Sequence, residues 1–430
     1  MPRPRPRTLA IGALALLLAA APFVPRGGDD DGALLPSGEQ EQRGLAPAAT
    51  APLGSVSAAN QAEIDRVLAQ GRAAARTLGR VPVAQEPDRL AAALVRCAEF
   101  DGQRYCLHSG WTEDSETEVQ ARMATAARAV ASRPQGRTTT GDLDELATLQ
   151  RLARMDPSAR EAQERSELTL AARSVAKVWL LRHEIEGVPI PAEFLAAHPE
   201  ATTAAPGATS AQPAARTASA SPTASATPTS DPSVQQRKHR RDYPQRSVVL
   251  DTQQVAEQQR TYWCGPTTMQ MIAWGWKDKD LGQAHWADKL GTTTSGTAIT
   301  DMVRVVNAST GWDRADHAGA YITLDIGDYT FGKWQLLLFR HIDDYHAPVV
   351  LHPILLKKYY PYLDDDASGH FQAGRGYDKR GKKSNQIGYF EPWNQQRFDP
   401  SEPYIARVQW RSAYKSYRAN LAHFQHNIGV

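Results

Sequence analysis

The sequence predicts an α+β protein with a helical first region and a second region that mixes helix and strand. Apolar residues recur at helical spacing before residue 200, whereas strand-like apolar runs and eight of the ten tryptophans follow residue 260. A segment made almost wholly of Ala, Thr, Ser and Pro, from Ala201 to about Ser233, separates the two regions. Helices first and strands later favour an α+β layer architecture.

At 430 residues the chain is long enough for two or three units. Residues 27–54 are rich in Gly, Pro and Ala and carry an acidic run, which is typical of disorder. We therefore predict five parts in order: a signal peptide (1–26), a disordered segment (27–54), a mainly helical domain (55–200), an Ala/Thr/Ser/Pro-rich linker (201–241) and a domain of helices and strands (242–430).

The N-terminus has the pattern of a secretory signal. Arg3, Arg5 and Arg7 precede an apolar run from Leu9 to Ala21 that ends in small residues. This run is shorter than the roughly 20 residues that cross a bilayer, and a retained signal anchor is the alternative interpretation. No later segment is apolar enough for stable membrane insertion. The sequence thus predicts a secreted protein, extracellular or associated with the cell wall, and its Ala-, Arg- and Pro-rich composition suggests a bacterial source.

The charge balance argues against a strongly charged partner. Lys and Arg number 49, Asp and Glu number 47, and the net charge is +2. Nucleic-acid binding needs a concentrated basic face, but the dense basic cluster Arg237–Arg241 lies at the end of the linker. We interpret this cluster as a solvated linker, with proteolytic processing as the alternative. Oligomeric state is not predicted.

Three amphipathic stretches support the helical domain. They lie at Ile64–Leu68, Leu143–Leu152 and Leu168–Ile185. Asp142 and Asp144 suit the start of the second helix, because acidic residues favour helix N-termini. None of the three stretches carries a catalytic motif. The role of this domain stays open between an inhibitory or folding prosegment, a partner-binding domain and a spacer.

The chain contains three cysteines, Cys97, Cys106 and Cys264. In an exported protein the first two are close enough in sequence to close a small disulfide loop. That pairing would leave Cys264 as an odd thiol. No CxxC motif and no Cys/His spacing typical of zinc is present. We therefore predict no metal and no cofactor.

Cys264 opens the run Cys264-Gly265-Pro266, and an apolar, helix-periodic stretch follows to Ile272. This pattern places the sulfur at a helix N-terminus, where unpaired N–H groups and the helix dipole favour a thiolate. A thiolate is the nucleophilic form of cysteine. The alternative is a buried cysteine at an ordinary helix start.

Two short runs, His370–Tyr377 and Ile387–Phe390, flank a polar turn and suggest a β-hairpin. A thiol nucleophile needs a base, and the base needs a group that orients it. His370 begins the first run and is the candidate base. Glu391 directly follows the second run, so pairing of the two runs would bring its carboxylate close to the imidazole. Asn394 is the alternative orienting residue.

The oxyanion that forms during attack on a carbonyl needs hydrogen-bond donors. Gln258, six residues before the cysteine, is the candidate donor, and Gln259 competes for this role. Five other histidines of the C-terminal domain compete for the role of base but have no acidic partner in a comparable motif: His285, His317, His341, His346 and His352.

Together these motifs resemble the papain-superfamily cysteine peptidases, and among them the bacteriocin-processing (double-glycine leader) peptidase-like branch. The resemblance rests on Gln258, Cys264-Gly265-Pro266, Gly369-His370-Phe371 with Gly376-Tyr377-Asp378, and Phe390-Glu391-Pro392-Trp393. It covers about residues 243–415. It implies a papain-like fold, with the nucleophile helix packed on an antiparallel sheet. It also implies that Gln258 is the oxyanion residue, Cys264 the nucleophile, His370 the base and Glu391 the orienting acid, where the family usually has Asp.

Three functions follow from this interpretation. The leading one is a secreted cysteine peptidase-like hydrolase that cleaves peptide or amide bonds of a peptide or protein substrate through a Cys264 thioester. The second is a peptidoglycan-directed amidase or acyl transferase with the same triad, since papain-like folds host several such reactions. The third is a secreted binding module without catalytic turnover.

Overall fold

The computed structural model describes the chain from residue 53 onward in segments, all of which belong to the unit Ala33–Val430. The described residues are 53–78, 87–132, 140–201, 237–278, 280–314, 317–360, 366–380, 386–393, 406–408, 415–416 and 427–430. The predicted signal peptide, most of the predicted disordered segment and most of the predicted linker lie outside these residues.

The first region contains the helices that the apolar periodicity predicted. Asp144 caps α4 by accepting the N–H of Ala147, and Asp156 caps α5 with Pro157 in its first turn. The helices and helical turns of this region are α1 (Ala58–Leu78), α2 (Pro87–Leu94), α3 (Glu116–Ala131), α4 (Glu145–Arg154), α5 (Pro157–Leu181), η1 (Arg182–Glu186), α6 (Ala192–Ala197) and η2 (Pro199–Ala201).

This region also holds three strands that the helical patterns did not predict: β1 (Cys97–Phe100), β2 (Gln103–Cys106) and β3 (Gly110–Thr112). Cys97 and Cys106 lie directly opposite each other in the antiparallel β1–β2 pair and form a disulfide. The expected pairing of these two cysteines is therefore confirmed. Cys264 is the free cysteine.

Replacing both Cys97 and Cys106 by Ser is expected to lower the free energy of unfolding by about 2–3 kcal/mol. The disulfide joins residues nine positions apart and restricts the unfolded chain accordingly. Urea unfolding followed by far-UV circular dichroism measures the change. The wild-type chain in reductant is the control and should unfold at the same urea concentration as the double variant. Equal stability of the oxidised chain and the double variant would contradict the expectation.

The second region begins with the turns η3 (Arg240–Asp242) and η4 (Thr252–Gln254) and mixes helices with short strands. Its helices are α7 (Cys264–Lys277), α8 (Gln283–Leu290), α9 (Ile299–Ser309), α10 (Phe331–Phe339) and the π-helical turn η5 (Arg340–Asp344). Its strands are β4 (Arg246–Val248), β5 (Thr323–Asp325), β6 (Val349–Leu351), β7 (Gln372–Asp378), β8 (Gln386–Phe390), β9 (Ala406–Val408) and β10 (Asn427–Gly429). Helices together with a largely antiparallel sheet confirm the α+β class.

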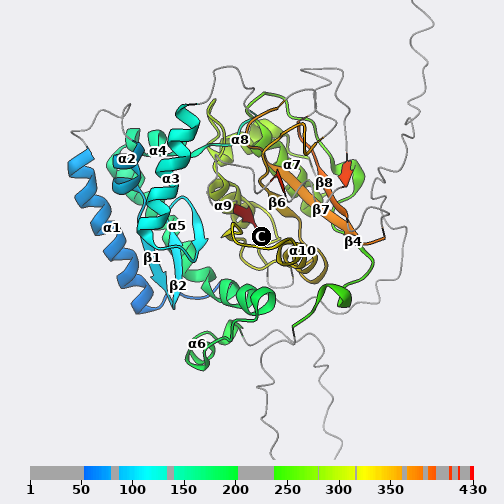
Figure 1. Cartoon of the computed structure of the whole chain (residues 1–430), viewed down its shortest axis with the longest axis horizontal. Helices are drawn as coiled ribbons and strands as arrows, with labels where there is room; N and C mark the ends of the chain where they lie inside the picture. The colour runs from blue at the N-terminus through cyan, green and yellow to red at the C-terminus, as the bar shows by residue number, and fades with distance from the viewer. Residues whose placement is uncertain are drawn as a thin grey trace, which may run out of the picture. The chain divides into compact units, whose positions relative to one another are not determined.

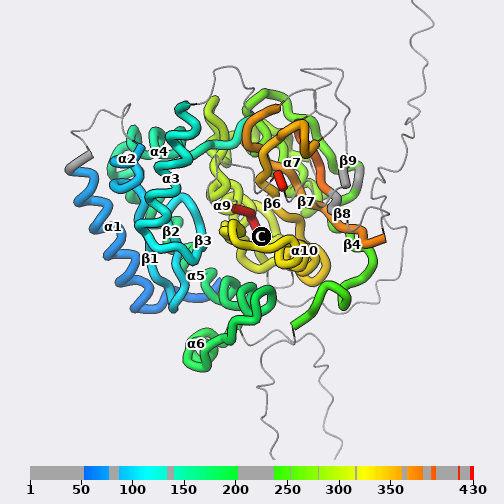
Figure 2. Tube along the Cα trace, viewed as in Figure 1, coloured from blue at the N-terminus to red at the C-terminus, as the bar shows by residue number. Residues whose placement is uncertain are grey.

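One sheet joins the two regions. Among the described residues its order is β1-β2-β3-β5-β10-β6-β7-β8-β9, and β4 pairs with β7. The join is the parallel pairing of β3 with β5, where Trp111 lies opposite Leu324. Figure 1 shows α7 beside β6, β7 and β8, and Figure 2 shows β1, β2 and β3 next to α5.

The sequence predicted a separate helical region, and in this respect it was wrong. The regions share the sheet and one hydrophobic core, to which Val175 of α5 and Met269 of α7 both belong. Glu184 in η1 also pairs with the buried Arg340 of η5 at 2.7 Å. Such contacts join residues far apart in sequence, so no local sequence pattern predicts them. The exact domain boundaries stay a prediction.

The end of the predicted linker is held against the second region. Lys238 forms an ion pair with Asp344, and Arg240 donates to the side chain of Gln335 at 2.6 Å. Arg237 also donates to the carbonyl oxygens of Glu184 and Ile185, so the basic cluster is docked through three of its residues rather than fully solvated. Across the described part of the chain, none of the helices combines the length and apolar character that a membrane span requires.

Candidate active site

Cys264 lies at the first position of α7, as the Cys-Gly-Pro pattern predicted. The preceding residue, Trp263, makes no side-chain hydrogen bond that caps the helix. The backbone N–H of Cys264 therefore stays available to a group outside the helix. It donates to the carbonyl oxygen of Thr140, at 3.2 Å. The start of the nucleophile helix thus contacts a residue from the first region of the chain.

The thiol of Cys264 is fully buried. Burial is the main reason that its pKa lies well above the ordinary value, and the nearby Asp142 carboxylate raises the pKa further. Backbone hydrogen bonds from Phe371 and Gly265 act in the opposite direction. Burial and the Asp142 carboxylate thus oppose the thiolate that the helix start alone favours. Asp142 belongs to residues 140–143, which we call the covering segment.

His370 and Glu391 come together at the end of the β7–β8 hairpin. In the antiparallel register Ala373 of β7 lies opposite Phe390 of β8. Glu391, which follows β8, therefore lies beside the residues around the start of β7, where His370 is found. Nε2 of His370 lies 2.5 Å from Oε1 of Glu391, and both side chains are buried. The predicted proximity of these two residues is confirmed. The extra methylene of Glu, compared with Asp, therefore still reaches the imidazole.

Glu391 also accepts hydrogen bonds from two other donors. Nε2 of Gln372 donates to its Oε2 at 2.6 Å, and the backbone N–H of Trp393 donates to its Oε1 at 2.8 Å. Sequence reasoning missed Gln372. Residues two apart on a strand point to the same face, so its position two residues after His370 could have indicated it. These donors hold the carboxylate in one orientation.

The two ring nitrogens of His370 differ in their surroundings. Nε2 faces Glu391, whereas Nδ1 is buried and has no hydrogen-bond partner among the described residues. The sulfur of Cys264 lies against the backbone N–H of the next residue, Phe371. Glu391 therefore engages Nε2 of the ring and leaves Nδ1 without a partner among the described residues.

Gln258 is buried beside the nucleophile, whereas Gln259 is exposed. The side-chain amide of Gln258 donates to the carbonyl oxygens of Arg260 and Thr261 at 2.9 and 3.0 Å. It also lies 3.4 Å from the carbonyl oxygen of Thr140. Gln258 therefore faces the same carbonyl as the Cys264 N–H. The alternative orienting residue, Asn394, lies outside the described residues.

His352 was set aside at the sequence level because no acidic residue accompanies it in a motif. In the structure its Nε2 lies 3.5 Å from a carboxylate oxygen of Asp142, and its Nδ1 lies 2.8 Å from Oδ1 of Asn427. The ring also stacks on Phe371. His352 therefore binds the covering segment, and Glu391 remains the partner of His370.

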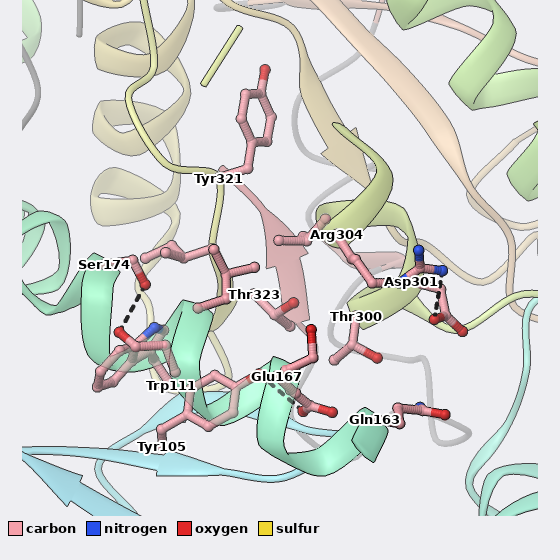
Figure 3. Close-up of a pocket in the computed structure, with 15 residues that line it drawn as sticks. Tyr105, Trp111, Gln163, Glu167, Ser174, Thr300, Asp301, Arg304, Tyr321 and Thr323 are labelled. Atoms are coloured by element: carbon pink, nitrogen blue, oxygen red, sulfur yellow. Dashed lines mark hydrogen bonds and ion pairs between the residues drawn. The ribbon is translucent and has the colours of Figure 1, made fainter. Parts of the chain in front are cut away.

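A cavity of about 300 Å³ lies away from these residues, where α5, β2 and β3 meet α9 and β5. Figure 3 shows Glu167 and Gln163 of α5 on one side and Thr300, Asp301 and Arg304 of α9 on the other. Cys264, His370 and Glu391 do not line this cavity. In the described part of the chain, no cluster of His, Cys, Asp and Glu is arranged to hold a metal ion.

Comparison with known proteins agrees with the geometry of the C-terminal region. Comparisons with curated proteins and with solved structures returned no match. A family comparison matched residues 247–420, less than half of the chain, to the Peptidase_C39 like family. This stretch contains Gln258, Cys264, His370 and Glu391. Residues 247–420 are thus similar to the Peptidase_C39 like family, which agrees with the resemblance to papain-like cysteine peptidases.

Proposed function

We propose that the protein is a secreted cysteine peptidase-like hydrolase that cleaves peptide bonds through a thioester on Cys264. The observation that carries this proposal is the buried His370–Glu391 pair, whose second ring nitrogen has no hydrogen-bond partner among the described residues, while the N–H of the next residue, Phe371, contacts the Cys264 sulfur. A histidine oriented by an acid next to a thiol is the arrangement that thiol catalysis requires.

Each residue has a distinct role in this proposal. His370 removes the proton of the Cys264 thiol and later delivers it to the leaving amine. Glu391 fixes the ring orientation and stabilises its protonated form. The backbone N–H of Cys264 and the amide of Gln258 donate to the oxyanion. The Gln258 amide nitrogen now lies 3.4 Å from the carbonyl oxygen of Thr140, so it has to move closer to an oxyanion at this position to donate a strong hydrogen bond.

A peptide is the substrate class that the site favours. The segment Thr140–Leu143 already lies against Cys264, Gln258 and Gly369, so these surfaces accommodate a polypeptide backbone. Export is part of the proposal because of the signal-like sequence at 1–26. The disulfide between Cys97 and Cys106 supports it, since disulfides persist in oxidising compartments.

The test is to incubate the purified chain with casein and, in parallel, with peptidoglycan, and to identify new amino termini by mass spectrometry. We expect release of casein peptides in the wild-type chain and none when Cys264 is replaced by Ala. Products from peptidoglycan alone would instead indicate the amidase alternative. Casein cleavage that is unchanged in Cys264→Ala would contradict the proposal.

A further inference from the structure

Residues 140–143, which the sequence placed at the start of a helix in the first region, lie across the candidate active site. The carbonyl oxygen of Thr140 accepts the backbone N–H of Cys264 at 3.2 Å and faces the Gln258 amide at 3.4 Å. These are the two donors proposed to stabilise an oxyanion. Such donors are aimed at the carbonyl of the bond under attack. The Thr140 carbonyl thus occupies the position of a scissile carbonyl.

Thr140 is anchored next to the residue that precedes the base. Its N–H donates to Oγ of Ser368 at 3.0 Å, and its hydroxyl donates to the carbonyl oxygen of Gly369 at 2.6 Å. Its side chain is completely buried. These contacts fix Thr140, the residue that precedes the Thr140–Gly141 bond, in place.

The residues that follow this bond, Gly141–Leu143, are held by hydrogen bonds to Thr297. The carbonyl oxygen of Gly141 accepts the N–H of Thr297 at 2.9 Å, and the N–H of Leu143 donates to the carbonyl oxygen of Thr297 at 2.8 Å. Asp142 and Thr297 therefore form a parallel β-bridge. Hydrogen bonds on both sides thus fix the Thr140 carbonyl in one position, as the attack on a substrate carbonyl requires.

Two glycines make this close approach possible. Gly141 has φ of +109°, and a Cβ there would lie 2.2 Å from the carbonyl carbon of Tyr262. A Cβ on Gly369 would lie 1.9 Å from a carboxylate oxygen of Asp142. At each of these two positions a side chain would keep the segment out of the site.

We propose that Thr140–Leu143 is an intramolecular substrate and that Cys264 cleaves the Thr140–Gly141 peptide bond of its own chain. This inference rests on the proposed function. The thiol proton passes to Nδ1 of His370 as the sulfur adds to the Thr140 carbonyl carbon. The bond to the Gly141 nitrogen breaks as His370 returns the proton to that amine. One water then hydrolyses the Thr140 thioester, which gives a carboxylate and restores the thiol.

Cleavage uncovers the site without requiring the protein to fall apart. The Cys97–Cys106 disulfide lies entirely in the first fragment, so no covalent bond joins the two products. The β3–β5 pairing and the shared core continue to hold them together. Denaturing gels should therefore show two fragments, whereas size-exclusion chromatography should show one species.

The experiment follows the purified full chain over time by intact mass and by sequencing of new termini. We expect one product that ends at Thr140 and one that begins at Gly141, at a rate that does not change on tenfold dilution. Cys264→Ala should stay intact. Gly141→Ala should lose the cut, because its Cβ meets Tyr262. Gly291→Ala is the matched control, since Gly291 also has positive φ but nothing within 4 Å of its Cβ position, and it should be cut like the wild type.

The outcomes separate this inference from the proposed function. If the wild-type chain stays intact at Thr140–Gly141 but hydrolyses casein through Cys264, the inference is overturned and the peptidase proposal stands. If neither the chain's own bond nor any added substrate is cleaved, both are overturned. A cut that persists in Gly141→Ala, or one whose rate falls on dilution, also overturns the intramolecular substrate.

Discussion

Replacing Cys264 by Ala is expected to lower kcat/KM for peptide hydrolysis by about 10⁴-fold or more. The substitution removes the atom that forms the thioester, and only substrate binding and the oxyanion donors remain to accelerate the reaction. The measurement should be made in the Gly141→Ala background as well as in the natural chain. In that background the covering segment is displaced whether residue 264 is Cys or Ala. The difference in kcat/KM then reflects the loss of the nucleophile and not a difference in access to the site.

Cys264→Ser is the informative companion of this variant. The hydroxyl has nearly the same shape as the thiol but is far harder to deprotonate, so hydrolysis should stay close to that of Cys264→Ala. Gly141→Ala alone is the positive control and should hydrolyse the peptide. Activity of Cys264→Ala within tenfold of this control would exclude the cysteine as nucleophile.

Replacing Glu391 by Gln is expected to lower kcat by about 10²- to 10⁴-fold with little change in KM. The carboxylate accepts from His370, Gln372 and the Trp393 N–H at 2.5–2.8 Å. An amide has one acceptor oxygen and an NH₂ group that cannot accept, so at least one of these donors is left facing another donor. The imidazole then loses its fixed orientation and the negative charge that stabilises its protonated form.

Gln372→Met is the matched control for Glu391→Gln, because it removes one donor while keeping the carboxylate and the volume of the side chain. Its kcat should fall by about tenfold, as expected for the loss of one hydrogen bond to a charged group. A lower kcat with unchanged KM indicates a residue that positions the imidazole, whereas a higher KM with unchanged kcat indicates a residue that binds the substrate. A rise in KM at unchanged kcat in Glu391→Gln would contradict the orienting role.

The parts of the fold and site that were predicted depend on residues close together in sequence. The helix at Cys264, the hairpin that brings Glu391 to His370, and the Asp144 cap all follow from spacing, turn chemistry or capping. These elements could be predicted because each depends on residues that are near one another in the sequence. Gln258 is buried and Gln259 is exposed, whereas the choice of Gln258 as the oxyanion donor stays a prediction.

The parts that were missed depend on pairing between distant residues. Trp111 meets Leu324 across the shared sheet, and Thr140 meets Cys264 across more than a hundred positions. Asp142 was read as part of a helix start, but its carboxylate lies beside His352 and the helix begins after Asp144. Helical and strand periodicity describe one element at a time. They therefore cannot indicate that a loop from one region will fill a site in another.

The strand β10 has a consequence for the order in which the protein can assemble. Residues 427–429 lie between β5 and β6, in the interior of the sheet, although they are synthesised after almost all of its other strands. Asn427 in this strand also holds His352, the residue that faces Asp142 of the covering segment. The growing chain thus cannot complete the sheet around Cys264 until its last strand has emerged. Final assembly has to wait until residues 427–429 have left the ribosome, and any self-cleavage that needs the finished site has to wait with it.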